Sequence, residues 1–299
     1  MISPKELQKK YADGYNISAI LRKELNVTCN TKEIIEISYD IQTGSYTQKM
    51  QEKEYADFKE KYSKELTNTI LSLCEPKSIL EAGVGEATTL CSVLKHLNKD
   101  IKSYGFDLSW SRTFYAKNYL QRHNITNTSL CCGDLLNIPF LDDSIDVVYT
   151  SHSIEPNGGQ EEQILRELYR VTRKFLILLE PDYKLSSKES KERMDLHGYC
   201  KNLDTIAHSL GYNVLKHEPF SLSYNPLNPT ALTIISKQSD TPSPSEVFAC
   251  PKLKTPLKKI ANAMYSPESL TAYPILDDIA CLKIENGIFA SKYQEIMED

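Results

Sequence analysis

Several features that would define a class of protein are missing from this sequence of 299 residues. No apolar run reaches the roughly 18 residues that a membrane-spanning helix needs. The first residues, MISPKELQKKYADGYN, lack the apolar core of a secretory signal. Basic residues are also in deficit, because the formal net charge is −5 and gives no general attraction to a phosphate backbone. We therefore expect no membrane span, and nucleic acid is not favoured as a partner.

The cysteines lack the spacing of a disulfide framework, although there are eight of them. Cys131 and Cys132 are adjacent, and adjacent cysteines seldom form a bridge with each other. There is no His-x-x-x-His motif and no paired-cysteine motif of the kind that holds zinc, so we expect no metal. Free thiols of this kind favour a reducing, cytoplasmic location.

Composition divides the chain into four predicted segments. Residues 1–66 are rich in Lys and Glu and mostly helical in pattern. Residues 67–238 alternate apolar strands with amphipathic helices, as in an α/β domain with a mostly parallel, doubly wound sheet. Residues 239–246 belong to a Pro/Ser-rich linker, SKQSDTPSPSE, and residues 247–299 form a small tail with apolar positions of its own. Three of the predicted strands are SILEAGV, KSYGFDL and IDVVYTSH.

Candidate ligand-binding residues lie at the ends of the predicted strands. The first strand ends in a loop with Glu81, Gly83 and Gly85, and the second ends at Asp107. The third ends in CCGD, which places Asp134 at the same edge, because the carboxyl ends of parallel strands lie together. Each signal alone is weak, since glycines form turns and aspartates cap helices in many proteins. Together they predict a ligand site at this edge.

At these residues the sequence resembles the class I S-adenosylmethionine-dependent methyltransferases, in the branch of small-molecule and surface-sugar methylases. LEAGVGEAT resembles the first motif of that family, GFDLSWS the second, and CGDLLNIPFLDDSIDVVYTSH the third and fourth together. The resemblance covers residues 78–183 and extends weakly to PTALTIISK, as a last antiparallel strand. It implies a Rossmann-like fold with a seven-stranded sheet, and S-adenosylmethionine as the cofactor.

The resemblance also implies a role for each of these residues in binding the cofactor. Gly83 and Gly85 would let the loop approach its methionine and ribose, and Glu81 would help bind the ammonium end. Asp107 would accept hydrogen bonds from both ribose hydroxyls, and Asp134 from the adenine amine. The adenine would lie between the side chains of Leu108 and Leu135.

Candidate catalytic residues come from the loops that follow the strands. His152 and Glu155 lie in SHSIEPNGG, where the family places its acceptor-facing motif, and His197 precedes a glycine in RMDLHGYC. A general base is needed where a hydroxyl or amine acceptor loses a proton. His152 alternatively orders its own loop, and His197 alternatively marks a packed helix kink.

Two tyrosines of the N-terminal region are candidates for a lid over the cofactor. Tyr39 and Tyr46 flank a small-residue turn in SYDIQTGSYT, and related methyltransferases close the site with N-terminal helices of this kind. The alternative is a surface turn at Gly44. We therefore predict an N-terminal helical lid.

The tail carries a second resemblance, to the small zinc-ribbon-like domain that activates certain tRNA and translation-factor methyltransferases. VFACPKLKTPL keeps Cys250, but Leu253 stands where its zinc-binding partner would be. We therefore expect a degenerate, metal-free α+β domain that docks on the core or on another subunit. The tail is also a candidate surface for a homo-oligomer.

The sequence favours O-methylation of a small-molecule or carbohydrate acceptor of the surface-polysaccharide type. The loop SHSIEPNGG lacks the Asn/Asp-Pro-Pro-aromatic signature of base-amine and glutamine methylases. Three alternatives remain open at this stage: a tRNA or protein methyltransferase, a non-catalytic cofactor-binding scaffold, and a nicotinamide oxidoreductase. The last is disfavoured because Thr88 replaces the third glycine of G-x-G-x-x-G.

Overall fold

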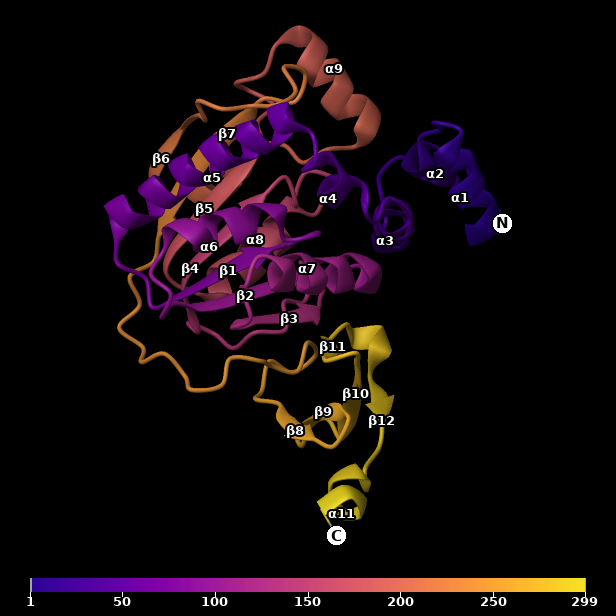
Figure 1. The fold of residues 1–299 in the computed structure, drawn as a ribbon, viewed down its shortest axis with the longest axis vertical. Coiled ribbons are helices and arrows are strands. Elements are labelled where there is room, and N and C mark those ends of the chain that lie inside the picture. The colour runs from indigo at the N-terminus through magenta and orange to yellow at the C-terminus, as the bar shows by residue number, and fades with distance from the viewer. Residues whose placement is uncertain (1, 299) are drawn as a thin grey trace.

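A central β-sheet covered by helices on both faces forms the body of the protein (Figure 1). The computed structural model describes residues 2–298, so residues 1 and 299, the outermost positions of the predicted terminal segments, lie outside the described part. The core strands are β1 (Ser78–Ala82), β2 (Lys102–Asp107), β3 (Thr128–Cys132), β4 (Ile145–Ser151), β5 (Thr172–Pro181), β6 (Asn213–Pro219) and β7 (Thr230–Ser236).

These strands lie in the order β6-β7-β5-β4-β1-β2-β3. Strands β1 to β5 pair in parallel, whereas β7 runs antiparallel to both β5 and β6. The prediction of a mostly parallel α/β sheet is therefore confirmed. Strand order reverses beside β1, between β2 and β4, and in such sheets the ligand crevice lies at that point.

Alternate residues of each strand pack into two separate apolar layers, one on each face of the sheet. Ile79 packs with helices α5 (Lys53–Leu73), α6 (Thr88–His96) and α7 (Trp110–Arg122). Its neighbour Leu80 packs on the other face, with α8 (Glu161–Val171) and α10 (Leu203–Ser209). Both residues are fully buried, so β1 is apolar on both faces, as expected for a central parallel strand.

The tail extends the sheet. Its strands are β8 (Lys258–Ile260), β9 (Ala263–Ser266), β10 (Thr271–Leu276), β11 (Ile279–Cys281) and β12 (Ile288–Phe289), followed by α11 (Tyr293–Glu298). Strand β11 pairs in parallel with β3, and the N–H of Leu282 donates to the carbonyl of Cys132 at 2.9 Å. The predicted count of seven strands is wrong for this reason, since the described sheet has twelve.

Four short helices precede the long helix α5: α1 (Pro4–Ala12), α2 (Ile17–Leu25), α3 (Lys32–Ile41) and α4 (Ser45–Lys49). The first three bury an apolar cluster of their own around Leu7, Leu21 and Ile34. Helix α5 spans residue 66 and inserts Leu66 and Ile70 into the core. Helices α1 to α4 lie beside the carboxyl edge of the sheet, whereas α5 crosses one of its faces (Figure 1).

Helix α3 also contacts the tail through two ion pairs. Lys283 pairs with Glu36, and the Nζ of Lys32 lies 2.8 Å from Oε2 of Glu285. Lys283 is 7% exposed, so its buried ammonium depends on Glu36 and on Glu285, which lies 4.0 Å away. The N-terminal helices and the C-terminal tail are therefore joined directly, although they lie at opposite ends of the sequence.

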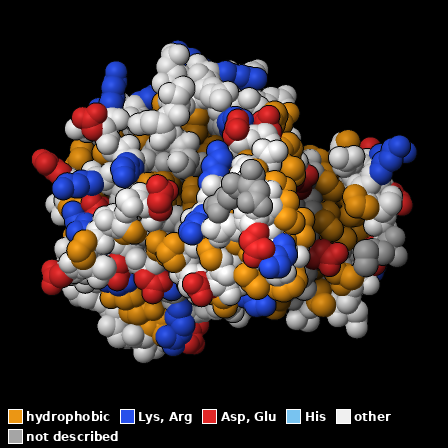
Figure 2. Space-filling view, turned by 90° about the horizontal axis from the view of Figure 1, so that it is seen from below, with side chains coloured by type: hydrophobic (Ala, Val, Ile, Leu, Met, Phe, Trp, Pro, Cys, Tyr) orange, Lys and Arg blue, Asp and Glu red, His pale blue; other side chains and the backbone are white. Residues whose placement is uncertain are grey.

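The outer face of the tail mixes charges of both signs with apolar side chains (Figure 2). Ile288 and Phe289 of β12 and Ile296 of α11 are largely exposed. No helix in residues 2–298 has the length and apolar character that crossing a membrane requires.

Candidate functional site

A cavity of about 310 Å³ opens at the carboxyl edge of the sheet, between the strand ends and the N-terminal helices. Almost all the residues that the sequence singled out line it together: Tyr39, Tyr46, Glu81, Gly83, Gly85, Asp107, Leu108, Asp134, Leu135, His152 and Glu155. His197 is not among the lining residues.

The glycine loop follows β1 and holds both glycines at positive φ. Gly83 has φ +75° and Gly85 has φ +53°. A Cβ at Gly83 would lie 2.3 Å from the Cβ of Ser153, whereas one at Gly85 would meet only the side chain of Arg112 at 3.5 Å. Gly83 is thus required by close packing against the loop after β4, while Gly85 leaves space on the cavity side.

Asp107 ends β2 and faces this loop. Its Oδ2 accepts from the N–H of Gly85 at 2.9 Å, and its Oδ1 accepts from the N–H of Ser109 at 3.0 Å. Burial raises the pKa of Asp107, and the nearby Arg112 guanidinium opposes this effect. Each oxygen keeps further acceptor capacity, because a carboxylate has about four acceptor positions, and Asp107 lines the cavity.

Asp134 lies after β3 and is oriented from two sides. Its Oδ1 accepts from the N–H of Leu136 at 2.9 Å, and its Oδ2 lies 3.3 Å from the Nζ of Lys32. Lys32 comes from the first turn of α3, so this ion pair joins the N-terminal helices to the strand edge. A partner so far away in the chain was not predictable from the local pattern.

Glu81 is buried under the loop rather than open to it. Tyr149 donates to its Oε2 at 3.2 Å, and the ammonium of Lys59 on α5 stabilises its charge. Burial raises the pKa of Glu81 to about 8 and lowers that of Lys59 to about 8. Lys59 also donates to Thr89 at 2.6 Å. Burial thus disfavours the charge of both groups, and the attraction between Glu81 and Lys59 offsets part of that cost at the floor of the cavity.

Arg112 on α7 is a site residue that the sequence reasoning missed. Its guanidinium lies over the rings of Tyr39 and Tyr46, 4.9 Å and 5.0 Å from their centroids. Its Nε donates to the carbonyl of Tyr39 at 3.0 Å, but its Nη2 is buried without a hydrogen-bond partner among the described residues. A buried unpaired donor of this kind favours an anionic or carbonyl ligand group.

Glu86 is a second residue that was missed, and it fixes the turn before α4. Its carboxylate accepts from the N–H of Gly44 at 2.9 Å and from the N–H of Thr47 at 2.7 Å. It thus caps α4 from the glycine loop, as acidic groups do at helix N-termini. Its position in GVGEAT, directly after the second glycine, was the feature of the sequence that could have indicated a role in the site.

His152 and Glu155 contact each other at the cavity wall. Nδ1 of His152 lies 2.8 Å from Oε2 of Glu155, and its Nε2 lies 2.8 Å from Oγ1 of Thr230. Asn228 also donates to Glu155, at 3.0 Å. Burial opposes both charges, but the contact between the two residues outweighs it, so the pKa of His152 is raised and that of Glu155 is lowered.

Glu180 orders the loop that carries this pair. At the end of β5, its carboxylate accepts from the N–H groups of Ser153, Ile154 and Glu155 at 3.0 to 3.2 Å. Burial raises the pKa of Glu180 to about 7. The loop after β4 is therefore held by a buried carboxylate rather than by His152 alone.

His197 ends helix α9 (Lys188–His197), away from the cavity lining. Gly198 follows at φ +67° and closes the helix in a left-handed conformation, so there is a helix end here and no kink. The carbonyl of His197 accepts from Arg22 at 3.0 Å and from Asn30 at 3.1 Å. These contacts link α9 to α2, and a catalytic role of His197 stays a prediction.

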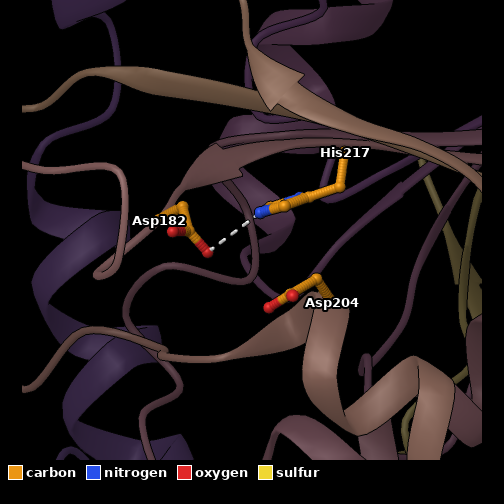
Figure 3. A group of neighbouring side chains, drawn as sticks. All are labelled: Asp182, Asp204 and His217. Atoms are coloured by element: carbon orange, nitrogen blue, oxygen red, sulfur yellow. Dashed lines mark ion pairs between the residues drawn. The ribbon is translucent and has the colours of Figure 1, made fainter.

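A separate group of titratable side chains lies between β5, β6 and α10 (Figure 3). Asp182, Asp204 and His217 bring their ligand atoms within 4.8 Å of one another. Lys184 already supplies a cation to Asp204 at 3.0 Å, and two backbone N–H groups bind Oδ1 of Asp182. We interpret this group as an ion-pair network and assign it no ligand.

Comparison with known proteins indicates the class of protein in which such a cavity occurs. Residues 79–174 match the family model that is described as a methyltransferase domain. This third of the chain is therefore similar to a methyltransferase domain. The protein is accordingly an enzyme, and its cofactor is S-adenosylmethionine.

The fold of the core is similar to that of a solved methyltransferase structure. Magnesium protoporphyrin IX methyltransferase from Synechocystis PCC 6803 is 12% identical, with a TM-score of 0.53, over 69% of this chain and 100% of that one. Geranyl diphosphate C-methyltransferase from Streptomyces coelicolor A3(2) is 10% identical, with a TM-score of 0.43, over 54% and 70% of the two chains. A methyltransferase from Aquifex aeolicus is 16% identical, with a TM-score of 0.42, over 59% and 97%.

Proposed function

We propose that this methyltransferase transfers a methyl group to a hydroxyl oxygen of a small-molecule or carbohydrate acceptor. The observation that carries the proposal is the contact between His152 and Glu155 at the wall of the cavity. A hydroxyl must lose its proton as the new C–O bond forms, and a histidine oriented by a carboxylate is suited to take it. Asn228 helps to fix the geometry of the pair. Nε2, the nitrogen left to take the proton, lies 2.8 Å from Oγ1 of Thr230, so this hydroxyl must turn away or pass the proton on.

The residues of the strand edge fit S-adenosylmethionine. Asp107 would accept from the ribose hydroxyls, and Asp134 from the adenine amine, with Leu108 and Leu135 beside the ring. The unpaired Nη2 of Arg112 would donate to the carboxylate of the methionine part. Space beside Gly85 leaves the loop backbone open to this ligand.

Other residues would enclose the ligand or supply charge. Tyr39 and Tyr46 would exclude water from the N-terminal side, and the Glu81–Lys59 pair would set the charge near the ammonium end. When bound, the sulfonium supplies an electrophilic methyl group, so alignment of the acceptor provides much of the rate enhancement.

Binding of the cofactor is tested by calorimetric titration with S-adenosylhomocysteine. Wild-type protein should bind it, and Asp107→Ala should bind at least tenfold more weakly, because charge-assisted hydrogen bonds contribute about 1.5–3 kcal/mol each. Asp100→Ala, at an exposed position in the turn before β2, is the matched control and should bind as the wild type does. Equal affinity of Asp107→Ala and wild type would refute this assignment.

The acceptor is tested by turnover on nucleotide-linked sugars and on phenolic and amine compounds. Transfer to oxygen should be lowered about 10²–10⁴-fold in His152→Gln, with affinity for S-adenosylhomocysteine unchanged. Methylation of amines alone, or full activity of His152→Gln, would contradict the proposal.

A further inference from the structure

We propose that the acceptor carries an anionic group, a carboxylate or a phosphate, which binds to Lys49 beside a wall of aromatic rings. This inference rests on the proposed function, because it concerns the acceptor side of the same cavity. Lys49 is the last residue of α4 and lines the cavity together with Tyr55, Phe58 and Tyr224.

The ammonium of Lys49 lies over two tyrosine rings. Its Nζ is 4.8 Å from the ring centroid of Tyr55 and 4.3 Å from that of Tyr224. These two rings meet edge to face at 4.9 Å, with an interplanar angle of 90°, and Phe58 lies 5.2 Å from Tyr224. Aromatic faces attract a cation, so they hold the ammonium in place without neutralising its charge.

The other cations of the cavity wall already face carboxylates. Lys32 pairs with Asp134, and charge attraction links Lys59 to Glu81 and Arg112 to Asp107. Lys49 differs, because its Nζ has neither an ion pair nor a hydrogen bond within residues 2–298. The cavity carboxylates, in turn, are bound by these cations, by backbone N–H groups or by His152. Among the lysines of the cavity wall, Lys49 is thus the one whose ammonium contacts only aromatic rings within residues 2–298.

The position of Lys49 separates it from the residues assigned to the cofactor. Tyr224 belongs to the segment between β6 and β7, which also supplies Asn228 to the His152–Glu155 pair. An acceptor held at Lys49 would thus lie with its flat or apolar part on the rings and with its hydroxyl toward His152. Both phosphorylated and carboxylated sugars match this description.

The proposal is tested on the full-length protein saturated with S-adenosylhomocysteine. The probes are benzoate, phenyl phosphate, neutral benzyl alcohol and cationic benzyltrimethylammonium, each titrated by calorimetry or ligand-observed NMR. Wild-type protein should bind at least one of the two anions tenfold or more tightly than benzyl alcohol. Lys49→Met should lose that preference, Lys49→Arg should keep most of it, and Lys53→Met, an exposed lysine of α5, should leave it unchanged.

Several outcomes would overturn the proposal. Equal binding of anions and benzyl alcohol would remove the role of charge, and preference for benzyltrimethylammonium would make the rings a site for cations. Weaker binding of S-adenosylhomocysteine to Lys49→Met would assign Lys49 to the cofactor instead. No binding of any probe to the loaded protein would also contradict it. Failure of the wild type to bind S-adenosylhomocysteine, measured first, counts against the proposed function itself.

Discussion

His152 and Glu155 are joined by a contact of 2.8 Å between Nδ1 and Oε2, in a turn where His152 has φ +56°. A non-glycine residue in this conformation is held there by its surroundings. The contact raises the pKa of His152 above its ordinary 6.5 and lowers that of Glu155 below 4.5. The pair therefore affects stability and catalysis with opposite pH dependence.

Stability should depend on this pair most strongly between about pH 4.5 and pH 6.5. The raised pKa of His152 contributes stability that is complete below 6.5 and is lost as pH rises through the folded value. The lowered pKa of Glu155 contributes stability that is present above 4.5 and is lost as pH falls through the folded value. Urea unfolding should show a larger loss for His152→Gln at pH 5.5 than at pH 8.5. A loss independent of pH would contradict this linkage.

The methyl-transfer rate should rise with pH through the pKa of His152, because a base must be neutral to accept a proton. Glu155→Gln removes the charge that raises this pKa, so the rising limb of kcat/KM should move to lower pH. The measurement is a pH–rate profile of both proteins on the same acceptor. If the rising limb of kcat/KM lies at the same pH in Glu155→Gln and in the wild type, a group other than His152 sets the pH dependence.

Gly83→Ala should destabilise the protein more than Gly211→Ala. The two positions share almost the same backbone conformation, with φ +75° and +74°, but a Cβ at Gly211 meets nothing within 4 Å. The left-handed conformation costs an alanine about 1–2 kcal/mol at either position. The clash with Ser153 should add about 1–3 kcal/mol at Gly83.

The double variant Gly83→Ala with Ser153→Gly supplies the check, because it removes the Cβ that causes the clash. It should recover part of the stability lost in Gly83→Ala, as judged by denaturant unfolding. If both single glycine variants are equally stable, the close packing of the two loops is not what requires Gly83.

Glu36→Gln should lower the free energy of unfolding by about 1–3 kcal/mol, because it removes the nearer of the two carboxylates at the buried ammonium of Lys283 and leaves only Glu285 at 4.0 Å. Exchanging the two charges, with Glu36→Lys and Lys283→Glu together, should restore part of the loss. Lys292→Met is the matched control, since Lys292 forms an exposed pair with Glu295 that contributes little. No recovery in the exchanged variant would mean that the ion pair does not join α3 to the tail.

The strand ends were predictable because their chemistry is local. Gly83, Asp107 and Asp134 each follow a short apolar run, and parallel topology alone brings such positions to one edge. Strand β6 was not found, since NVLKHEP has no apolar run and lies at the edge with mostly exposed or half-exposed side chains. Such a segment has no run of apolar residues from which a buried strand could be predicted.

The contacts between distant segments could not be predicted either. Lys32 with Asp134, Arg112 with Tyr39, and Glu86 with Gly44 join residues 42 to 102 positions apart. No periodicity or spacing rule links such positions in a single sequence. The same holds for β11 beside β3, because β11 has only three residues and its partner lies about 150 positions earlier.

The extended sheet ends at β6 on one side and at β8 on the other. Outermost strands have unpaired backbone groups and can recruit another chain, which leads to aggregation. Lys216, Glu218 and Pro219 occupy the first end, and Lys258 and Lys259 the second, all of them exposed. By pairing with Cys131 and Cys132, the tail covers the buried end of β3, and the outermost strand on this side becomes a short strand with two exposed lysines. Adding β11 to the sheet therefore also protects the protein against edge-to-edge association with other chains.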